Sequence, residues 1–299
     1  DQSETIALAS YLPPYLQPRK IYLMDYPEER LASVTGVRKP GAETDLIAGI
    51  NRGSAMISYF GHGNHRLLAH EQLLNQDVDL DKIQNGRRLF FFYPATCAFG
   101  RFDLPQAEGM SEDLIAANNR GAIATLNSVR DVFSRQNFSL ADKFYQHLFS
   151  ETPTARLGAA VVAAKNQVSV NVVNNEKFHL FGDPTLRLAL PMQQADAVAL
   201  STDSLTALSQ AQVTGNVQRD GALWTDFNGS VQVEVYDDQR TGVRVMENGE
   251  RVTYQLPGRS IFRGASNVTA SQAGQFSVGF IVPKDITYGG ENGRIGVYY

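Results

Sequence analysis

Residues 1 to 190 consist of short apolar runs that alternate with longer amphipathic segments, and this alternation constrains the fold more than any other feature of the chain. Short apolar runs between turn signals are typical of buried strands, whereas the longer segments have the apolar spacing of helices. Strands that alternate with helices in this way build an α/β fold around an open, mostly parallel sheet. The predicted strands are Lys20–Met24, Ser54–Phe60, Arg88–Tyr93 and Gly121–Leu126.

The segments between and after these strands predict helices on both faces of the sheet. The first three strands are apolar on both sides, as expected for strands that helices cover from each side. Leu140, Phe144 and Leu148 recur at every fourth position and form one apolar stripe of a helix. The other predicted helices span residues 44–51, 109–117 and the alanine-rich segment 154–168.

After Pro191 the pattern changes to an alternation of apolar and polar residues, as in Val231–Tyr236 and Phe276–Val282. Turn signals such as Asp220-Gly221 recur, which favours an all-β sandwich of immunoglobulin type. The predicted domains are therefore an α/β domain over 1–190, a linker over 191–203 and the β-sandwich over 204–299. We expect both ends of the chain to be cuts in a longer protein. In that case the first domain lacks its N-terminal part and the sandwich is truncated.

Charge and hydropathy exclude two classes of protein. The 299 residues carry a net charge of -4, whereas a nucleic-acid binder shows a concentrated basic face, so no nucleic-acid partner is expected. No apolar run approaches the roughly 18 residues that a membrane-spanning helix needs. The chain has one cysteine, which excludes an internal disulfide and leaves a free thiol.

Two of the predicted strands end in residues that carry chemistry. The strand through Phe60 runs into Gly61-His62-Gly63-Asn64, and the strand through Tyr93 runs into Pro94-Ala-Thr-Cys97. In an open parallel sheet, ligands bind at the carboxyl ends of the strands, so the imidazole and the thiol meet if these strands are neighbours. The imidazole would take the thiol proton, generate the nucleophilic thiolate, and later protonate the leaving amine.

The need for backbone to approach the substrate closely explains a glycine directly after His62. A residue without a side chain lets the backbone approach the scissile carbonyl, so the N–H groups of Gly63 and Cys97 are the predicted oxyanion hole. Losing one such donor typically costs roughly a hundred-fold or more in rate.

Two structural explanations of these residues compete with the catalytic one. A lone cysteine after an apolar strand is most often a buried structural residue, and only its conjunction with His62 about one βα unit earlier favours catalysis. His62, His65 and His70 are also readable as metal ligands, but their spacing does not match a zinc pattern. We therefore expect neither a metal nor another cofactor.

The residues around these strand ends resemble a known family. Gly-His-Gly at one strand end and cysteine at the next is the arrangement in the clan of caspases, legumains and gingipains, and the segment Phe181–Arg187 is similar to gingipains. Within this group the chain is most similar to the PorU-type sortases of the type IX secretion system. This resemblance runs from about residue 20 to the end of the chain. Its segments are Tyr59–Asn64, Ala95–Asp103, Asn127–Arg130 followed by Asn137, Asp226–Gly229, Ile261–Gly264 and Phe280–Ile286.

The resemblance implies a caspase- or gingipain-like fold and a cysteine peptidase with Cys97 as nucleophile and His62 as general acid and base. PorU-type enzymes remove the C-terminal signal domain from secreted cargo through a thioester and transfer the cargo to an amine of lipopolysaccharide. The implied location is the outer-membrane surface. The implied partners are the cargo proteins, the lipopolysaccharide amine and other subunits of the type IX attachment complex.

The resemblance also implies substrate-binding positions and leaves one position open. Asn64 and the loop residues Asn127, Ser128 and Arg130 should bind substrate beside the thiol. Gingipain-like enzymes take a third, acidic residue from an earlier strand to orient the histidine, and the matching segment lies upstream of this chain. Asp25 is the acid that closely follows the first predicted strand, and we do not assign it this role.

Two other functions stay open from the sequence. The first is a gingipain-like secreted endopeptidase, although no pocket acid for basic side chains is identifiable. The second is a non-catalytic docking module of an outer-membrane assembly, for which Cys97 would be dispensable.

Overall fold

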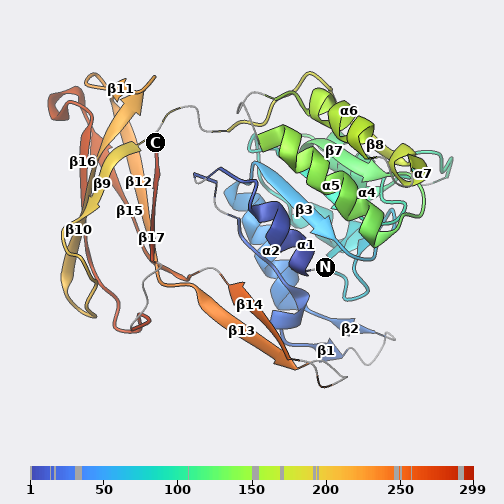
Figure 1. Cartoon of the computed structure of the whole chain (residues 1–299), viewed down its shortest axis with the longest axis horizontal. Helices are drawn as coiled ribbons and strands as arrows, with labels where there is room; N and C mark the ends of the chain where they lie inside the picture. Colours follow the sequence, from blue (N-terminus) through green and yellow to red (C-terminus); the bar gives the residue numbers. More distant parts are fainter. Residues whose placement is uncertain are drawn as a thin grey trace. The chain divides into compact units, whose positions relative to one another are not determined.

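A computed structural model of the chain contains two compact units, Asp1–Leu190 and Pro191–Tyr299, and each is described by itself (Figure 1). Thr154 and part of the predicted linker lie outside the described residues. No helix within the described part of the chain combines the length and apolar character that a membrane crossing requires. The structure describes residues 2–13, 15–16, 18–30, 36–106, 108–149, 155–168, 172–190, 193, 195–245, 249, 251–256, 258–288 and 293–299.

The first unit is organised around a sheet with the strand order β3-β6-β7-β8 (Figure 1). β3 (Met56–Phe60) pairs in parallel with β6 (Phe90–Ala95), which pairs in parallel with β7 (Ala122–Ser128). β8 (Phe178–Phe181) follows as an antiparallel neighbour of β7. The last three strands predicted from the sequence are therefore confirmed as parallel neighbours.

Helices cover both faces of this sheet because the strands are apolar on both sides. β6 is buried along its whole length, with the odd-numbered aromatic residues in one core and the even-numbered ones in the other. The first core contains residues of α5 (Ser134–Phe149) and α6 (Leu157–Gln167), which pack against each other. The second contains residues of α2 (Pro40–Arg52) and α4 (Met110–Ala116). The predicted apolar stripe of α5 is buried in the first core, which confirms that helix.

The predicted strand Lys20–Met24 is wrong. The segment ends in the 3₁₀ turn η1 (Leu23–Asp25), and its apolar residues pack beside the α2 core instead of joining the sheet. Lys39, only 5% exposed, donates from Nζ to the carbonyl oxygens of Leu23 at 2.7 Å and Tyr26 at 3.3 Å. These carbonyls are thus satisfied by a buried ammonium group rather than by a neighbouring strand.

Short elements complete this unit and connect the layers. α2 begins at Pro40, earlier than predicted, because proline is suited to the first turn of a helix. The remaining elements are α1 (Gln2–Ala9), β1 (Glu29–Arg30), β2 (Val37–Arg38), β4 (Leu67–Leu68), β5 (Leu74–Asn75), α3 (Gln76–Asp79), η2 (Leu80–Lys82) and α7 (Val172–Glu176).

The second unit is a sandwich of two sheets over one apolar core. One sheet has the order β11-β10-β16 with β9 also paired to β10, and the other has the order β15-β12-β17. Inward-facing residues of both sheets share the core, and Val213 of β10 and Val233 of β12 are fully buried there. The strands are β9 (Ala195–Leu200), β10 (Gln210–Arg219), β11 (Ala222–Leu223), β12 (Gly229–Tyr236), β15 (Ser260–Val268), β16 (Gln275–Ile281) and β17 (Arg294–Tyr298).

Two features of this unit add to or correct the sequence-based description. β13 (Arg240–Val245) and β14 (Arg251–Leu256) form a separate hairpin, and η3 (Ala270–Gln272) precedes β16. The predicted linker 191–203 contains β9, which pairs with β10 and so belongs to the sandwich. The sequence did not reveal this strand, because Ala195–Leu200 lacks strict alternation and Ala197 adopts a left-handed φ of 49°.

Two adjacent valines of α6 allow a matched test of the first core. Val161 is 7% exposed and Val162 is 59% exposed, so the same substitution removes the same methyl groups from different surroundings. We expect Val161→Ala to lower the free energy of unfolding by about 2 kcal/mol, and Val162→Ala to change it by less than about 0.5 kcal/mol. Urea unfolding followed by circular dichroism at the helix band measures both. Equal effects would contradict the assigned packing of α6.

Candidate active site

The ends of β3 and β6 bring the two predicted catalytic residues to one edge of the sheet. The strands are direct neighbours, and the parallel register aligns Phe60 with Ala95. His62 therefore follows the end of β3 by two residues, and Cys97 follows the end of β6 by two residues. The sequence left open whether these two strands are neighbours, and the structure shows that they are.

The two glycines beside His62 are required for different close approaches. A Cβ atom on Gly61 would lie 2.5 Å from the hydroxyl oxygen of Tyr59, whose ring folds back over this position. A Cβ atom on Gly63 would lie 2.7 Å from the carbonyl oxygen of Leu67 and 2.8 Å from Oγ1 of Thr96. Gly63 thus lets the loop after β3 approach the residue that precedes Cys97.

The Cys97 thiol is half-buried at the start of a turn that continues beyond β6. Its Sγ donates to the carbonyl oxygen of Val132 at 3.5 Å. The backbone after it is held to the end of β7 and the segment that follows, since Ala98 N donates to Arg130 O at 3.1 Å and Gly100 N donates to Ser128 O at 2.9 Å. The turn that carries Cys97 is therefore fixed by the end of β7 and the residues after it.

His62 is exposed, and its backbone carbonyl is held by two donors. Ala69 N donates to it at 2.8 Å, and the Tyr59 hydroxyl donates to it at 2.7 Å. Burial raises the pKa of the Tyr59 phenol, so the hydroxyl stays protonated and remains a donor. The His62 ring stacks on the ring of His70, with centroids 5.4 Å apart and planes 6° from parallel.

The two predicted oxyanion donors are available. Leu68 lies opposite Gly63, but the hydrogen bonds around this bridge are made by Asn64 N and Ala69 N. Within the residues that the structure describes, neither Gly63 N–H nor Cys97 N–H has a hydrogen-bond acceptor. Both groups follow the adjacent ends of β3 and β6.

Asn127 and Ser128, predicted to contact substrate, are fully buried instead. The amide nitrogen of Asn127 donates to the hydroxyls of Ser111 at 3.0 Å and Thr125 at 2.5 Å. The hydroxyl of Ser128 donates to the carbonyl oxygen of Thr96. Ser128 thus holds the residue before Cys97, whereas Asn127 is bonded within the core, and in this structure neither buried side chain can contact a substrate.

The other two predicted substrate-binding residues are exposed. Arg130 forms a two-pronged ion pair with Asp103, with nitrogen–oxygen distances of 3.0 and 2.7 Å, and this pairing lowers the pKa of the Asp103 carboxyl. Asn64 uses its side-chain oxygen to accept from Arg66 N at 2.8 Å, which closes a local turn. Both side chains lie on segments that flank the two strand ends.

The sequence analysis missed the aromatic residue beside the thiol. Phe133 follows Val132, whose carbonyl accepts from Cys97, and its side chain is 65% exposed. Its backbone N–H donates to Oδ1 of Asn174 at 3.0 Å, and Nδ2 of Asn174 donates to Oδ1 of Asn137 at 3.1 Å. Both asparagines are buried, so the loop is braced while the ring stays accessible. No local signal distinguishes this phenylalanine from those in the core.

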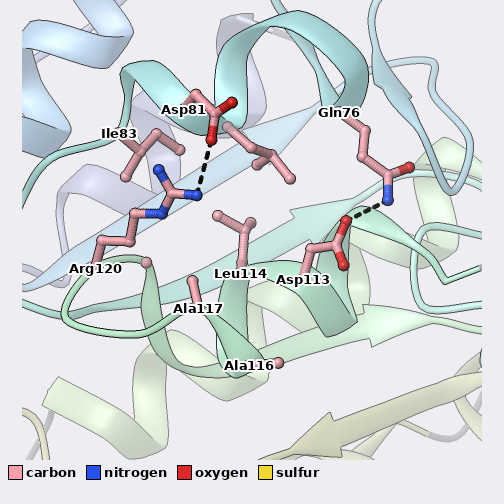
Figure 2. Close-up of a pocket in the computed structure, with 10 residues that line it drawn as sticks. Gln76, Asp81, Ile83, Asp113, Leu114, Ala116, Ala117 and Arg120 are labelled. Atoms are coloured by element: carbon pink, nitrogen blue, oxygen red, sulfur yellow. Dashed lines mark hydrogen bonds and ion pairs between the residues drawn. The ribbon is translucent and has the colours of Figure 1, made fainter.

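A cavity of about 350 Å³ lies along α4, away from all the predicted site residues (Figure 2). Leu80, Ile83 and Leu114 contribute apolar side chains to its lining. Figure 2 shows Arg120 paired with Asp81 and Gln76 paired with Asp113 on either side of Leu114. The cavity contains no nucleophile and base in contact, so we assign it no part in the chemistry of Cys97.

The competing interpretation of His62, His65 and His70 as metal ligands finds no support in the described residues. His62 and His70 face each other as stacked rings, and burial with the nearby Arg66 and Arg101 lowers the pKa of His65. No group of three histidine, cysteine, aspartate or glutamate side chains within the described ranges converges as metal ligands would.

In a comparison with protein families, the model described as peptidase family C25 matches residues 2–189. Several solved structures are similar to the chain. Three of these are a complex of the pro- and mature domains of Porphyromonas gingivalis RgpB (15% identity, TM-score 0.44), the Arg-specific cysteine proteinase gingipain R, RgpB (16%, 0.43), and a structure described as a protease (13%, 0.43). The matches cover 72%, 85% and 79% of this chain and 56%, 55% and 56% of those structures. The chain thus spans about half the length of the structures it matches. Comparison with curated proteins gave no match.

The predicted pairing of His62 as base with Cys97 as nucleophile implies a histidine-dependent thiol. Iodoacetamide should alkylate Cys97 faster at mildly acidic pH than a cysteine in an unfolded peptide, because an imidazole can take the thiol proton. His62→Ala should slow alkylation at least about tenfold. Since the chain has one cysteine, intact mass spectrometry follows the reaction without ambiguity. An alkylation rate that His62→Ala leaves unchanged would contradict the pairing.

Proposed function

Because the chain belongs to peptidase family C25 and carries a gingipain-family cysteine peptidase domain, we propose that Cys97 and His62 are the catalytic pair of a sortase-type peptidase. The observation that supports the pair is the parallel register of β3 and β6, which places both residues at one sheet edge. In this proposal the enzyme cleaves a peptide bond and transfers the acyl fragment to an amine.

The first half of the reaction forms a thioester. His62 takes the proton from Sγ of Cys97, and the thiolate adds to the scissile carbonyl carbon. The carbonyl oxygen becomes an oxyanion that accepts hydrogen bonds from the free N–H groups of Gly63 and Cys97. Protonated His62 then gives its proton to the leaving amine as the carbon–nitrogen bond breaks, which leaves the acyl group on Sγ.

The second half decides between a sortase and a hydrolase. An amine or a water molecule adds to the thioester carbonyl while His62 accepts its proton, and the same oxyanion donors are used again. Collapse of the intermediate breaks the carbon–sulfur bond, and His62 returns the proton to the thiolate. An amine gives a new amide, whereas water gives a carboxylate. The exposed position of His62 lets either nucleophile reach the thioester.

The substrate and acceptor in this proposal rest on the resemblance of the local motifs to PorU-type sortases. The substrates are secreted cargo proteins that end in a type IX signal domain, and the acceptor is an amine of lipopolysaccharide. The enzyme would act at the outer-membrane surface with other subunits of the attachment complex. Support comes from Tyr59–Asn64 and Ala95–Asp103, which surround the catalytic pair, and from motifs in the second unit.

A gingipain-like endopeptidase is the second candidate, since the family match supports it equally. The two candidates share every step as far as the thioester. They differ only in whether an amine competes effectively with water, so the product distinguishes them.

The segment after Val132, whose carbonyl accepts from the Cys97 thiol, offers an exposed apolar side chain for a substrate residue. Phe133 is 65% exposed, and Nζ of Lys177 lies 5.9 Å from its ring centroid. An aromatic or aliphatic substrate side chain that covers this ring would remove apolar surface from water. We propose that this surface binds the residue next to the scissile bond.

Exchange of Phe133 tests this specificity. Phe133→Ala should lower kcat/KM about tenfold for peptides with an aromatic residue next to the scissile bond, and much less for peptides with alanine there. Phe102→Ala is the matched control, because Phe102 is 56% exposed but packs against His179 and Phe181 on β8. Equal losses in both variants, or no loss in Phe133→Ala, would contradict the proposed subsite.

The sortase reaction is tested on the complete protein. We expect incubation with a cargo protein bearing its signal domain and an excess of a small amine to give a truncated cargo that carries the amine. Intact mass spectrometry identifies the product, and Cys97→Ala serves as the inactive control. Truncation by water alone would favour the endopeptidase. No product in the presence of the attachment-complex partners would favour a docking module.

A further inference from the structure

The His62 ring has an unexpected neighbour. A catalytic imidazole generally needs a third group to hold it in the orientation that faces the nucleophile. In the part of the chain that the structure describes, the His62 side chain has no hydrogen bond and no ion pair. Its ring contact is His70, at a centroid distance of 5.4 Å and with an interplanar angle of 6°.

The backbone between the two histidines holds this stack in place. A short turn is closed by the hydrogen bond from Asn64 N to Leu67 O at 2.9 Å, and Gly63 pairs with Leu68. Ala69 N then returns to His62 O at 2.8 Å, which places the next residue, His70, beside His62. Since these contacts lie within one short loop, the stack forms together with the loop.

Ala69 is held in a costly conformation directly before His70. Its φ is 61°, a left-handed value that residues with a Cβ atom seldom adopt, and the residue is only 5% exposed. Strained backbone persists where surrounding contacts over-determine it, and it is common at functional sites. Here the strained residue directly follows β4 and carries the chain to the position where His70 meets His62.

Tyr59 holds the start of this loop by a hydrogen bond. Its hydroxyl donates to the same His62 carbonyl at 2.7 Å, and this ring position requires the absence of a side chain at Gly61. The backbone of His62 is therefore fixed from two sides. What remains free is rotation of the imidazole about its side-chain bonds, and the His70 ring restricts that rotation.

We propose that His70 is a positioning residue that stacks on the His62 imidazole and keeps it oriented toward Cys97. This inference rests on the proposed role of His62 as the base. The stacking does not need a proton on His70, so a phenyl ring at this position should serve equally well. Stacked aromatic pairs contribute enough to change the population of the oriented ring roughly three- to tenfold.

Two variants of the same position separate stacking from a general structural role. His70→Ala should lower kcat and the rate of Cys97 alkylation roughly three- to tenfold, while KM stays unchanged. His70→Phe should restore both rates to within about twofold of the starting protein. Equal impairment of the two variants, an effect on KM alone, or no effect of His70→Ala would each overturn the proposal.

A measurement without catalysis makes the test independent of the proposed function. In proton NMR spectra, the carbon-bound ring protons of His62 should be shifted upfield by the His70 ring, and His70→Ala should remove that shift while His70→Phe keeps it. Unchanged His62 resonances in His70→Ala would overturn the stack. If the shift behaves as expected but His62→Ala leaves alkylation unchanged, the catalytic pair fails, not the stack.

Discussion

The parallel pairing of β3 with β6 is the constraint on which the rest of the candidate site depends. It aligns Phe60 with Ala95, so the segments after β3 and β6 leave the sheet at the same level and at the same edge. Burial of β6 between two apolar cores protects this pairing, because backbone groups shielded from water lose much when a hydrogen bond breaks. The position of the two candidate residues at one sheet edge is thus a consequence of strand register. The helices act on it indirectly, through the cores that they build on the two faces.

In the loops after β3 and β6, strained backbone conformations and short-range hydrogen bonds fix the positions of the candidate residues. Ala69 and Ala98 both adopt left-handed φ values, 61° and 48°, one in each of the two loops. Such a conformation costs about 1–2 kcal/mol for a residue with a Cβ atom, and the surrounding hydrogen bonds over-determine it. The glycines beside His62 serve close approaches of different partners, Tyr59 and Thr96. The Gly-His-Gly motif is therefore a packing requirement as well as a chemical signature.

Sequence patterns predicted those parts of the fold that depend on residues near each other in the chain. The spacing of apolar residues identified β3, β6 and β7 and the stripe of α5, because an element buried on one or both faces has apolar residues at regular intervals. The same reasoning failed for Lys20–Met24, where apolar residues pack against a core without joining the sheet. Periodicity reports burial, and it cannot distinguish a strand from a segment whose carbonyls a buried Lys39 satisfies.

The sequence by itself determined the chemical types at the site, since Cys97 is the one thiol and His62 stands between two glycines at a strand end. Only the tertiary structure decided which neighbours are reachable. Asn127 lies in a predicted loop and is buried, whereas Phe133 resembles a core residue and is exposed. The physical reason is that exposure is set by contacts between distant segments, such as the pair of buried asparagines that braces the Phe133 loop. No local pattern records a contact of that kind.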